Sequence, residues 1–173
     1  MRTRLFTNVS SLEDTYVLGS DLRLEKIKTD IVEEDLQTLL DNADAITSQR
    51  GGSGADDGWP YKYSLEDNLK DVAWLEICTR HQQLASYVIR NEANRYVGCI
   101  YVYPIELHYA YKAQEYNIDF SFWITQQDYD AGLYEGIYEG LLNWMATDLK
   151  IDLNRVFLRN PETPDTIREK VRG

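Results

Sequence analysis

The sequence predicts a single α/β domain in which a mixed, mostly antiparallel sheet is flanked by helices. Its 173 residues match the usual length of one domain. Hydrophobic residues make up 43% and charged residues 27% of the chain, which is typical of a globular protein. Segments with the alternation of strands are interleaved with segments that have the apolar spacing of helices, and no internal repeat or second domain is visible.

The first half of the chain predicts one strand and two helices. Residues 22–27 alternate apolar and polar side chains, as a half-buried strand does. Thr29 or Asp30 can cap a helix, and Ser64 can cap a second helix that ends near residue 79. The first helix is expected to turn four apolar residues to the core: Ile31, Leu36, Leu39 and Leu40.

Two segments of this half are expected to be flexible. Residues 1–15 have no clear periodicity, and residues 48–58 are rich in glycine. The glycine-rich loop is either a plain surface connection or a lid over a substrate.

The second half predicts a hairpin, a crossover and a last helix. Residues 86–90 and 96–103 form two strands around a turn, and residues 117–124 form a third. A long helix at 131–148 connects this third strand to a short strand at 155–158, and residues 166–171 are helical. The crossover should be right-handed, with its two strands parallel. The long helix carries an apolar stripe made of Leu133, Ile137, Leu141, Trp144 and Met145.

Composition excludes several classes of function. The net charge of −11 argues against a nucleic-acid partner, because binding to the phosphate backbone needs clustered Lys and Arg. The charge is compatible with a cationic acceptor such as an amine, although solubility alone explains it. We read no membrane span and no secretion signal, and Cys78 and Cys99 are expected to be buried thiols, so we expect a cytoplasmic protein.

The most informative stretch is residues 119–133, where a strand leads through a tight loop into the long helix. Loop amides and a helix N-terminus form a binding site for anions. The stretch resembles motif A of the GCN5-related N-acetyltransferases, and in particular the branch that acetylates N-terminal alanines of ribosomal proteins. Asp119 matches the acidic residue of the motif, Trp123 its tryptophan, Gln127 the first loop position and Gly132 the closing glycine.

The resemblance implies acetyl-CoA as co-substrate, no metal, and transfer of an acetyl group to a primary amine by direct attack. Asp119 would be the base, unless it is a structural carboxylate. Arg168, which matches the thiolate-protonating tyrosine of the family, could stabilise the thiolate or be an exposed helix charge. The coenzyme would bind along the motif and at Asn160, which a turn before Pro161 explains equally well. The coenzyme set is Trp123, Ile124, Thr125, Gln127, Asp130, Ala131, Gly132, Leu133 and Asn160.

Three departures from the family pattern support a second hypothesis, a catalytically inactive module that binds acyl-CoA weakly or acts through a protein partner. Asp130 stands where the family has its first glycine, and would either repel a pyrophosphate or cap the helix. Arg168 replaces the tyrosine. The family's C-terminal hairpin is missing, so the strand at 155–158 becomes an edge, which the last residues cover or a second copy pairs with to form a homodimer.

His108 and several tyrosines complete the candidates. His108 could act as a base, but a lone histidine in a predicted loop is more often polar surface. Four tyrosines could line the pocket of an amine acceptor or be ordinary sheet residues: Tyr101, Tyr103, Tyr109 and Tyr111.

Overall fold

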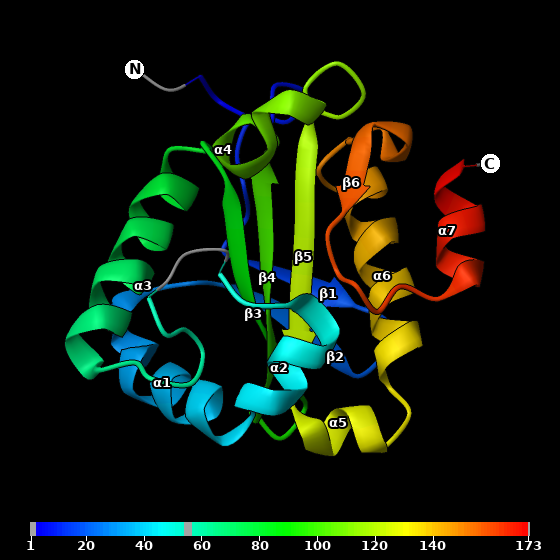
Figure 1. The fold of residues 1–173 in the computed structure, drawn as a ribbon. Helices are drawn as coiled ribbons and strands as arrows, with labels where there is room; N and C mark the ends of the chain where they lie inside the picture. The colour runs from blue at the N-terminus through cyan, green and yellow to red at the C-terminus, as the bar shows by residue number, and fades with distance from the viewer. Residues whose placement is uncertain (1–2, 54–56, 173) are drawn as a thin grey trace.

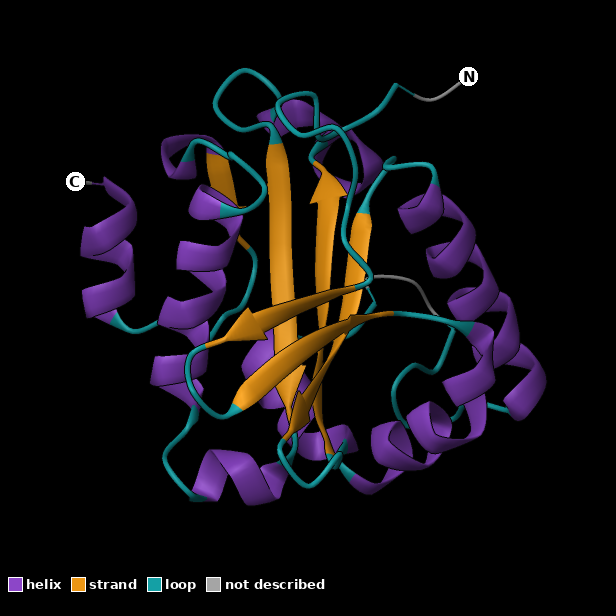
Figure 2. Cartoon of the chain, turned by 180° about the vertical axis from the view of Figure 1, so that it is seen from behind, coloured by secondary structure: helices purple, strands orange, loops and turns teal. Residues whose placement is uncertain are grey.

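The protein, described by a computed structural model over residues 3–53 and 57–172, is built on one six-stranded sheet (Figure 1). The strands follow one another in the sheet in chain order, and every neighbouring pair is antiparallel except the last. They are β1 (Thr15–Leu18), β2 (Leu22–Lys26), β3 (Ala85–Asn91), β4 (Tyr96–Pro104), β5 (Ile118–Ile124) and β6 (Val156–Leu158). Seen from behind, β1 and β2 cross β3 to β5 steeply, so the sheet is strongly twisted (Figure 2).

Helices cover both faces of the sheet (Figure 1). One face carries α1 (Val32–Asp41), α2 (Ala43–Arg50) and α3 (Leu65–Arg80), and the other carries α6 (Tyr134–Thr147) and α7 (Asp165–Arg172). Two short helices, α4 (Glu106–Tyr109) and α5 (Gln126–Asp130), lie at opposite ends of β5. Three 3-10 turns complete the chain: Thr29–Ile31, Ala110–Lys112 and Leu153–Arg155.

Each face of the sheet has its own apolar core, as alternation along β5 illustrates. Phe120 and Phe122 pack towards α6, whereas Trp123 packs towards α1 and α3. All three side chains are fully buried. The predicted mixed α/β sheet with its parallel crossover between β5 and β6 is therefore confirmed.

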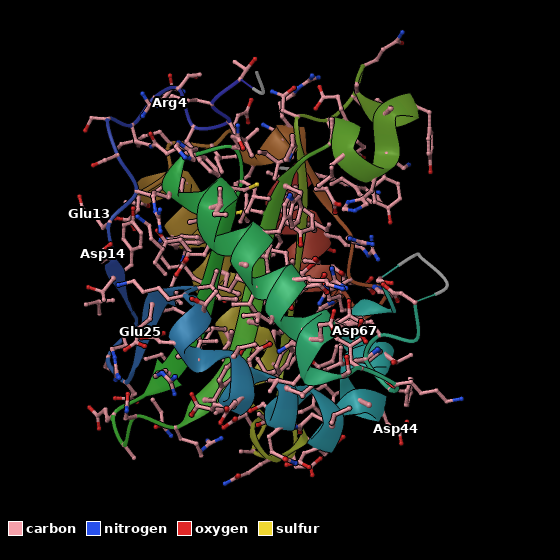
Figure 3. The ribbon with its side chains drawn as sticks, turned by 90° about the vertical axis from the view of Figure 1, so that its left-hand side faces the viewer. Arg4, Glu13, Asp14, Glu25, Asp44 and Asp67 are labelled. Atoms are coloured by element: carbon pink, nitrogen blue, oxygen red, sulfur yellow. The ribbon has the colours of Figure 1, made fainter. Side chains whose placement is uncertain are left out.

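The predicted N-terminal cap is confirmed for α3 and wrong for the first helix. Ser64 does cap α3: its hydroxyl accepts from the amide of Asp67 at 3.0 Å, and the Asp67 carboxylate accepts from the amide of Ser64. Figure 3 shows Asp67 at this end of the helix. The predicted cap of the first helix is wrong, because neither Thr29 nor Asp30 caps it through a side-chain hydrogen bond. Leu40 is 39% exposed and does not reach the core.

The two segments predicted to be flexible are partly built into the fold. Phe6 and Leu12 lie in the core between the sheet and α6. Residues 48–50, predicted as loop, form the last turn of α2. Residues 54–56 of the predicted loop lie outside the described residues. Both cysteines are buried, as predicted. Within the described ranges, no helix is long and apolar enough to cross a membrane.

Candidate functional site

The strands β5 and β6 separate within motif A, after Phe120. They pair over three residues each, and the pairing ends when the amide of Arg159 donates to the carbonyl of Phe120 at 2.9 Å. Alternate residues of a strand direct their backbone groups to the same edge. Phe122 and Ile124 therefore present an N–H and a C=O each to the gap that β6 leaves.

Side-chain amides of the protein itself bond these backbone groups. Asn160 accepts from the amide of Phe122 at 3.2 Å and donates to its carbonyl at 2.9 Å. Gln49 does the same for Ile124, at 2.9 Å and 3.0 Å. Both side chains are almost fully buried. We call Gln49 and Asn160 the amide clips.

Tyrosines from α6 hold the chain after β6 against the same gap. Tyr134 stacks on Phe122 with 5.2 Å between ring centroids, and its hydroxyl accepts from Asn160 at 2.9 Å and donates to the carbonyl of Glu162 at 2.5 Å. The hydroxyl of Tyr138 lies 2.9 Å from that of Thr163. Burial raises the pKa of Tyr138 to about 12, so it remains a phenol at neutral pH.

The loop of motif A differs from the prediction, because residues 126–130 form helix α5. Thr125 caps this helix by accepting from the amide of Asp128 at 3.3 Å, and the Asp128 carboxylate pairs with Arg95 at 2.6 Å and 2.9 Å. The three amides that follow α5 all donate to backbone carbonyls of α5: those of Ala131, Gly132 and Leu133.

Asp130 is not the helix cap that one hypothesis expected. It is exposed and accepts from the side chain of Gln126 at 2.7 Å. Leu133 precedes α6 without a side-chain cap and is 41% exposed, so it does not belong to the core stripe as predicted. Leu133 gives α6 no side-chain cap, and its carbonyl accepts from the amide of Ile137 at 3.0 Å.

Coenzyme A does not fit the gap in this conformation. The resemblance places a pantetheine arm along the backbone that the amide clips occupy, and a pyrophosphate on loop amides that already have acceptors. A cavity of about 230 Å³ beside Gln49 and Tyr129 is lined by the carboxylates of Asp44 and Glu162. These acids would repel phosphates.

The other predicted coenzyme and catalytic residues are scattered. Trp123 faces α1 and α3, where its indole N–H donates to Tyr101 at 3.0 Å. Gln127 is exposed at the surface of α5, and Arg168 is exposed on α7. The described part of the chain contains no group of three His, Cys, Asp or Glu side chains that could hold a metal ion.

Asp119 lies on the α1–α3 face and is the centre of a charged group. Its carboxylate is fully buried, and His108 Nδ1 and Arg159 Nη1 each lie 3.5 Å from Oδ2. Neither carboxylate oxygen has a hydrogen-bond partner, so both contacts are electrostatic at these distances. His108 was discounted as a lone histidine in a predicted loop, but it lies on α4, and its proximity to Asp119 depends on tertiary structure.

A second cavity of about 230 Å³ opens beside this group. Its walls come from α1, α3, β4 and the chain after β6, and Tyr101, Tyr103, His108 and Arg159 line it. Arg50, which sequence reasoning missed because it precedes two glycines, lies between Trp59 and Tyr101, 5.0 Å and 4.5 Å from the ring centroids. Burial, and then the charge of Arg159, lower the pKa of Arg50.

Comparison with solved structures identifies the fold. RimL, a ribosomal L7/L12 alpha-N-protein acetyltransferase in complex with coenzyme A, matches with a TM-score of 0.57 and 19% identity over 78% of this chain and 68% of that one. A ribosomal-protein-S5-alanine acetyltransferase from Vibrio fischeri matches with a TM-score of 0.56 and 9% identity, over 79% and 69%. A chimera of spermidine N-acetyltransferase from Vibrio cholerae and hSSAT matches with a TM-score of 0.52 and 13% identity, over 77% of this chain and 68% of that one.

These similarities confirm the fold that the resemblance predicted, including its likeness to the ribosomal-protein acetyltransferases. The identities are too low to carry more than the fold. No family model and no curated protein matches the sequence.

Proposed function

We propose that this domain is a binding module on the N-acetyltransferase fold and that acetyl-CoA is not its physiological ligand. The observation that carries the proposal is the occupation of the strand by the protein's own amides. Each clip makes two hydrogen bonds to backbone that a pantetheine arm would need. A coenzyme would have to break four hydrogen bonds and displace two buried side chains before gaining any of its own.

Calorimetry with acetyl-CoA tests the proposal before any acceptor is known. We expect no saturable heat for the wild-type protein below about 1 mM ligand, where binding is worth about −4 kcal/mol. A dissociation constant in the low micromolar range would contradict the proposal. A coenzyme-binding acetyltransferase of this fold, titrated in the same buffer, is the positive control.

Removal of the clips tests the physical reason for the exclusion. The double variant Gln49→Ala, Asn160→Ala frees the backbone groups of Phe122 and Ile124. If occupation is what excludes the coenzyme, a variant that keeps a cooperative melting transition should bind acetyl-CoA measurably. If the folded double variant still shows no binding of acetyl-CoA, the exclusion would be assigned to the carboxylates of Asp44 and Glu162 instead.

A second candidate is an acetyl-CoA-dependent N-acetyltransferase that acts on a primary amine, and the pairing of His108 with Asp119 favours it. A buried carboxylate 3.5 Å from Nδ1 would stabilise the imidazolium that forms when Nε2 accepts a proton from an amine. The uncapped first turn of α6 also leaves amides for an anion. The likeness to ribosomal-protein and spermidine acetyltransferases suggests peptide N-termini and polyamines as the first acceptors to assay.

Thiol release from acetyl-CoA in the presence of these amines distinguishes the two candidates. The binding module predicts no release above the rate without protein. The enzyme predicts release that falls by about 10²-fold or more in His108→Gln, as expected for the loss of a general base. The matched control is His81→Gln, because His81 lies in the described chain outside the cavity.

A further inference from the structure

The Arg50 cavity has a basic end that the function proposed above does not explain. Two guanidinium groups, Arg50 and Arg159, and the imidazole of His108 line it together. The side chain of Arg159 is only 8% exposed, and Arg50 as a whole is 6% exposed. Buried charges of one sign are costly unless an opposite charge lies close to them.

Asp119 balances only part of this charge. It lies within ion-pair distance of Arg159 and of His108. Among the described residues, no carboxylate comes within ion-pair distance of Arg50. Arg50 therefore has no ion-pair partner in this part of the chain, and Asp119, which already pairs with Arg159 and His108, acts on it only from beyond ion-pair distance.

The hydrogen bonds of Arg50 lead to the same conclusion. Its Nε donates to the hydroxyl of Ser121 at 3.0 Å and its Nη1 to the carbonyl of Gly52 at 3.3 Å, and both acceptors are neutral. A guanidinium has five N–H donors in a planar fork that matches a carboxylate. Three donors thus have no acceptor among the described residues, on a side chain that lines a cavity.

An ammonium ligand fits the cavity less well, although acids also line it. Arg50 already occupies the aromatic faces of Trp59 and Tyr101 that would stack on a cation. Asp35 is bound by Asn68 at 2.9 Å and by Tyr96, and burial raises the pKa of Asp35. Burial also raises the pKa of Asp71, which Tyr63 binds. A third acid of the lining, Asp57, accepts from the hydroxyl of Ser53 at 2.9 Å and from the amide of Trp59 at 3.0 Å. Each of the three carboxylates therefore already accepts at least one hydrogen bond from the protein.

We propose that this cavity binds a small ligand that carries a carboxylate on an apolar or aromatic body, with the carboxylate bonded to Arg50. The rings of Tyr101, Tyr103 and Trp74 and the side chains of Leu39 and Leu75 provide apolar walls for the body. A volume of about 230 Å³ limits the ligand to a small molecule. The proposal names the ligand class of the binding module and rests on that function.

Three ligands of similar size and different charge test the proposal on the wild-type protein. Phenylacetate, phenylacetamide and phenethylamine are titrated at neutral pH while tryptophan fluorescence is followed, because Trp59 and Trp74 line the cavity. We expect saturable binding of phenylacetate, at least about tenfold tighter than that of the amide or the amine. Equal affinities, or tighter binding of phenethylamine, would overturn the proposal.

Variants at position 50 locate the site. Arg50→Met should weaken phenylacetate binding by at least about tenfold and leave phenylacetamide unchanged. The affinity of Arg50→Lys for phenylacetate should lie between those of the wild type and Arg50→Met, because an ammonium keeps the charge but not the planar pair of donors. The matched control is Arg80→Met, since Arg80 is an exposed residue at the end of α3.

If Arg50→Met does not fold, the titrations of the three ligands on the wild-type protein still test the proposal, because they need no variant. Unchanged phenylacetate affinity in folded Arg50→Met would overturn the assignment of the carboxylate to this residue. Failure here is also separate from failure of the binding-module function, which acetyl-CoA calorimetry tests by itself.

Discussion

At the scale of single residues, two neighbours at the end of α2 serve different sites. Gln49 bonds the backbone of Ile124, 75 positions away, and Arg50 reaches Ser121. A glycine-rich segment follows them directly, and local sequence therefore predicted a loop. No local pattern can reveal such partners, because the contacts exist only after β5 and α2 meet.

Asn160 offers a direct test of the amide clips as structural elements. Asn160→Ala removes both hydrogen bonds to Phe122 and the bond to Tyr134. Two buried backbone groups then lack partners, each at a cost of about 1–3 kcal/mol. We expect the free energy of unfolding in urea to fall by about 2–4 kcal/mol. The exposed Asn154→Ala is the control, and a loss below about 0.5 kcal/mol in Asn160→Ala would contradict the role.

Asp35 should make stability depend on pH. Burial is the largest influence on its pKa and raises it above 3.8, while the bonds from Tyr96 and Asn68 oppose the shift. The folded state therefore holds its proton to higher pH than the unfolded state does. Stability from this group is full below the unfolded pKa and is lost as pH rises through the folded pKa.

The measurement compares wild type with Asp35→Asn by urea unfolding from about pH 4 to about pH 7. Relative to the variant, the wild-type free energy of unfolding should fall as pH rises, by at most about 1.4 kcal/mol per pH unit. A constant difference across this range would mean that the pKa of Asp35 is the same in the folded and unfolded states.

At the scale of elements, strong periodicity made the predictions succeed. The strands of the hairpin, β5, α3 and most of α6 lie where the sequence predicted them. Burial repeats at helical spacing along α3 and α6, whereas nearly every residue of β3, β4 and β5 is buried because helices cover both faces of the sheet. The prediction missed α2 and α5, whose buried residues include Gln49, Arg50 and Asp128. Polar residues that are buried through tertiary partners carry no hydrophobic signal, so these helices could not be predicted from pattern.

Two glycines in different elements should respond in opposite ways to the same substitution. In Gly98→Ala, the new Cβ on β4 would lie 2.1 Å from the carbonyl oxygen of Trp123 on β5, so the two strands would have to separate. Gly136 lies in the first turns of α6 with nothing within 4 Å of a Cβ, and alanine there favours the helix.

Thermal unfolding measures both effects. Gly136→Ala should raise the free energy of unfolding by about 0.5–1 kcal/mol. Gly98→Ala should lower it by about 2 kcal/mol or more, as overpacking of a core does. If Gly98→Ala raised stability as Gly136→Ala does, β4 and β5 could not approach each other as closely at Gly98 as the structure shows.

At the scale of the whole molecule, β5 takes part in both sites. Its edge carries the gap of motif A, which Gln49 of α2 and Asn160 close, and its Ser121 bonds Arg50 beside the cavity of the α1–α3 face. The sequence predicted the motif and its fold because strand, loop and helix are contiguous there. It could not predict the closure, which joins α2, β5, α6 and the chain after β6.

The N-terminal segment gives the last prediction, because sequence and structure differ on it. Residues 1–15 lack periodicity and were expected to be flexible, yet Phe6 is 2% exposed within the core beside α6. The amide of Leu5 also donates to the carbonyl of Gln82 at 2.7 Å, which ties the segment to the turn before β3.

Phe6→Ala should therefore behave as a core substitution and not as a change in a free terminus. Loss of a buried phenylalanine costs about 3–5 kcal/mol. For a domain of this size we expect the melting temperature to fall by about 10 °C. Val17→Ala is the control, since Val17 is 78% exposed on β1 and should shift stability by less than about 0.5 kcal/mol. If Phe6→Ala matched this control, the segment would be detached in solution, as the sequence alone predicted.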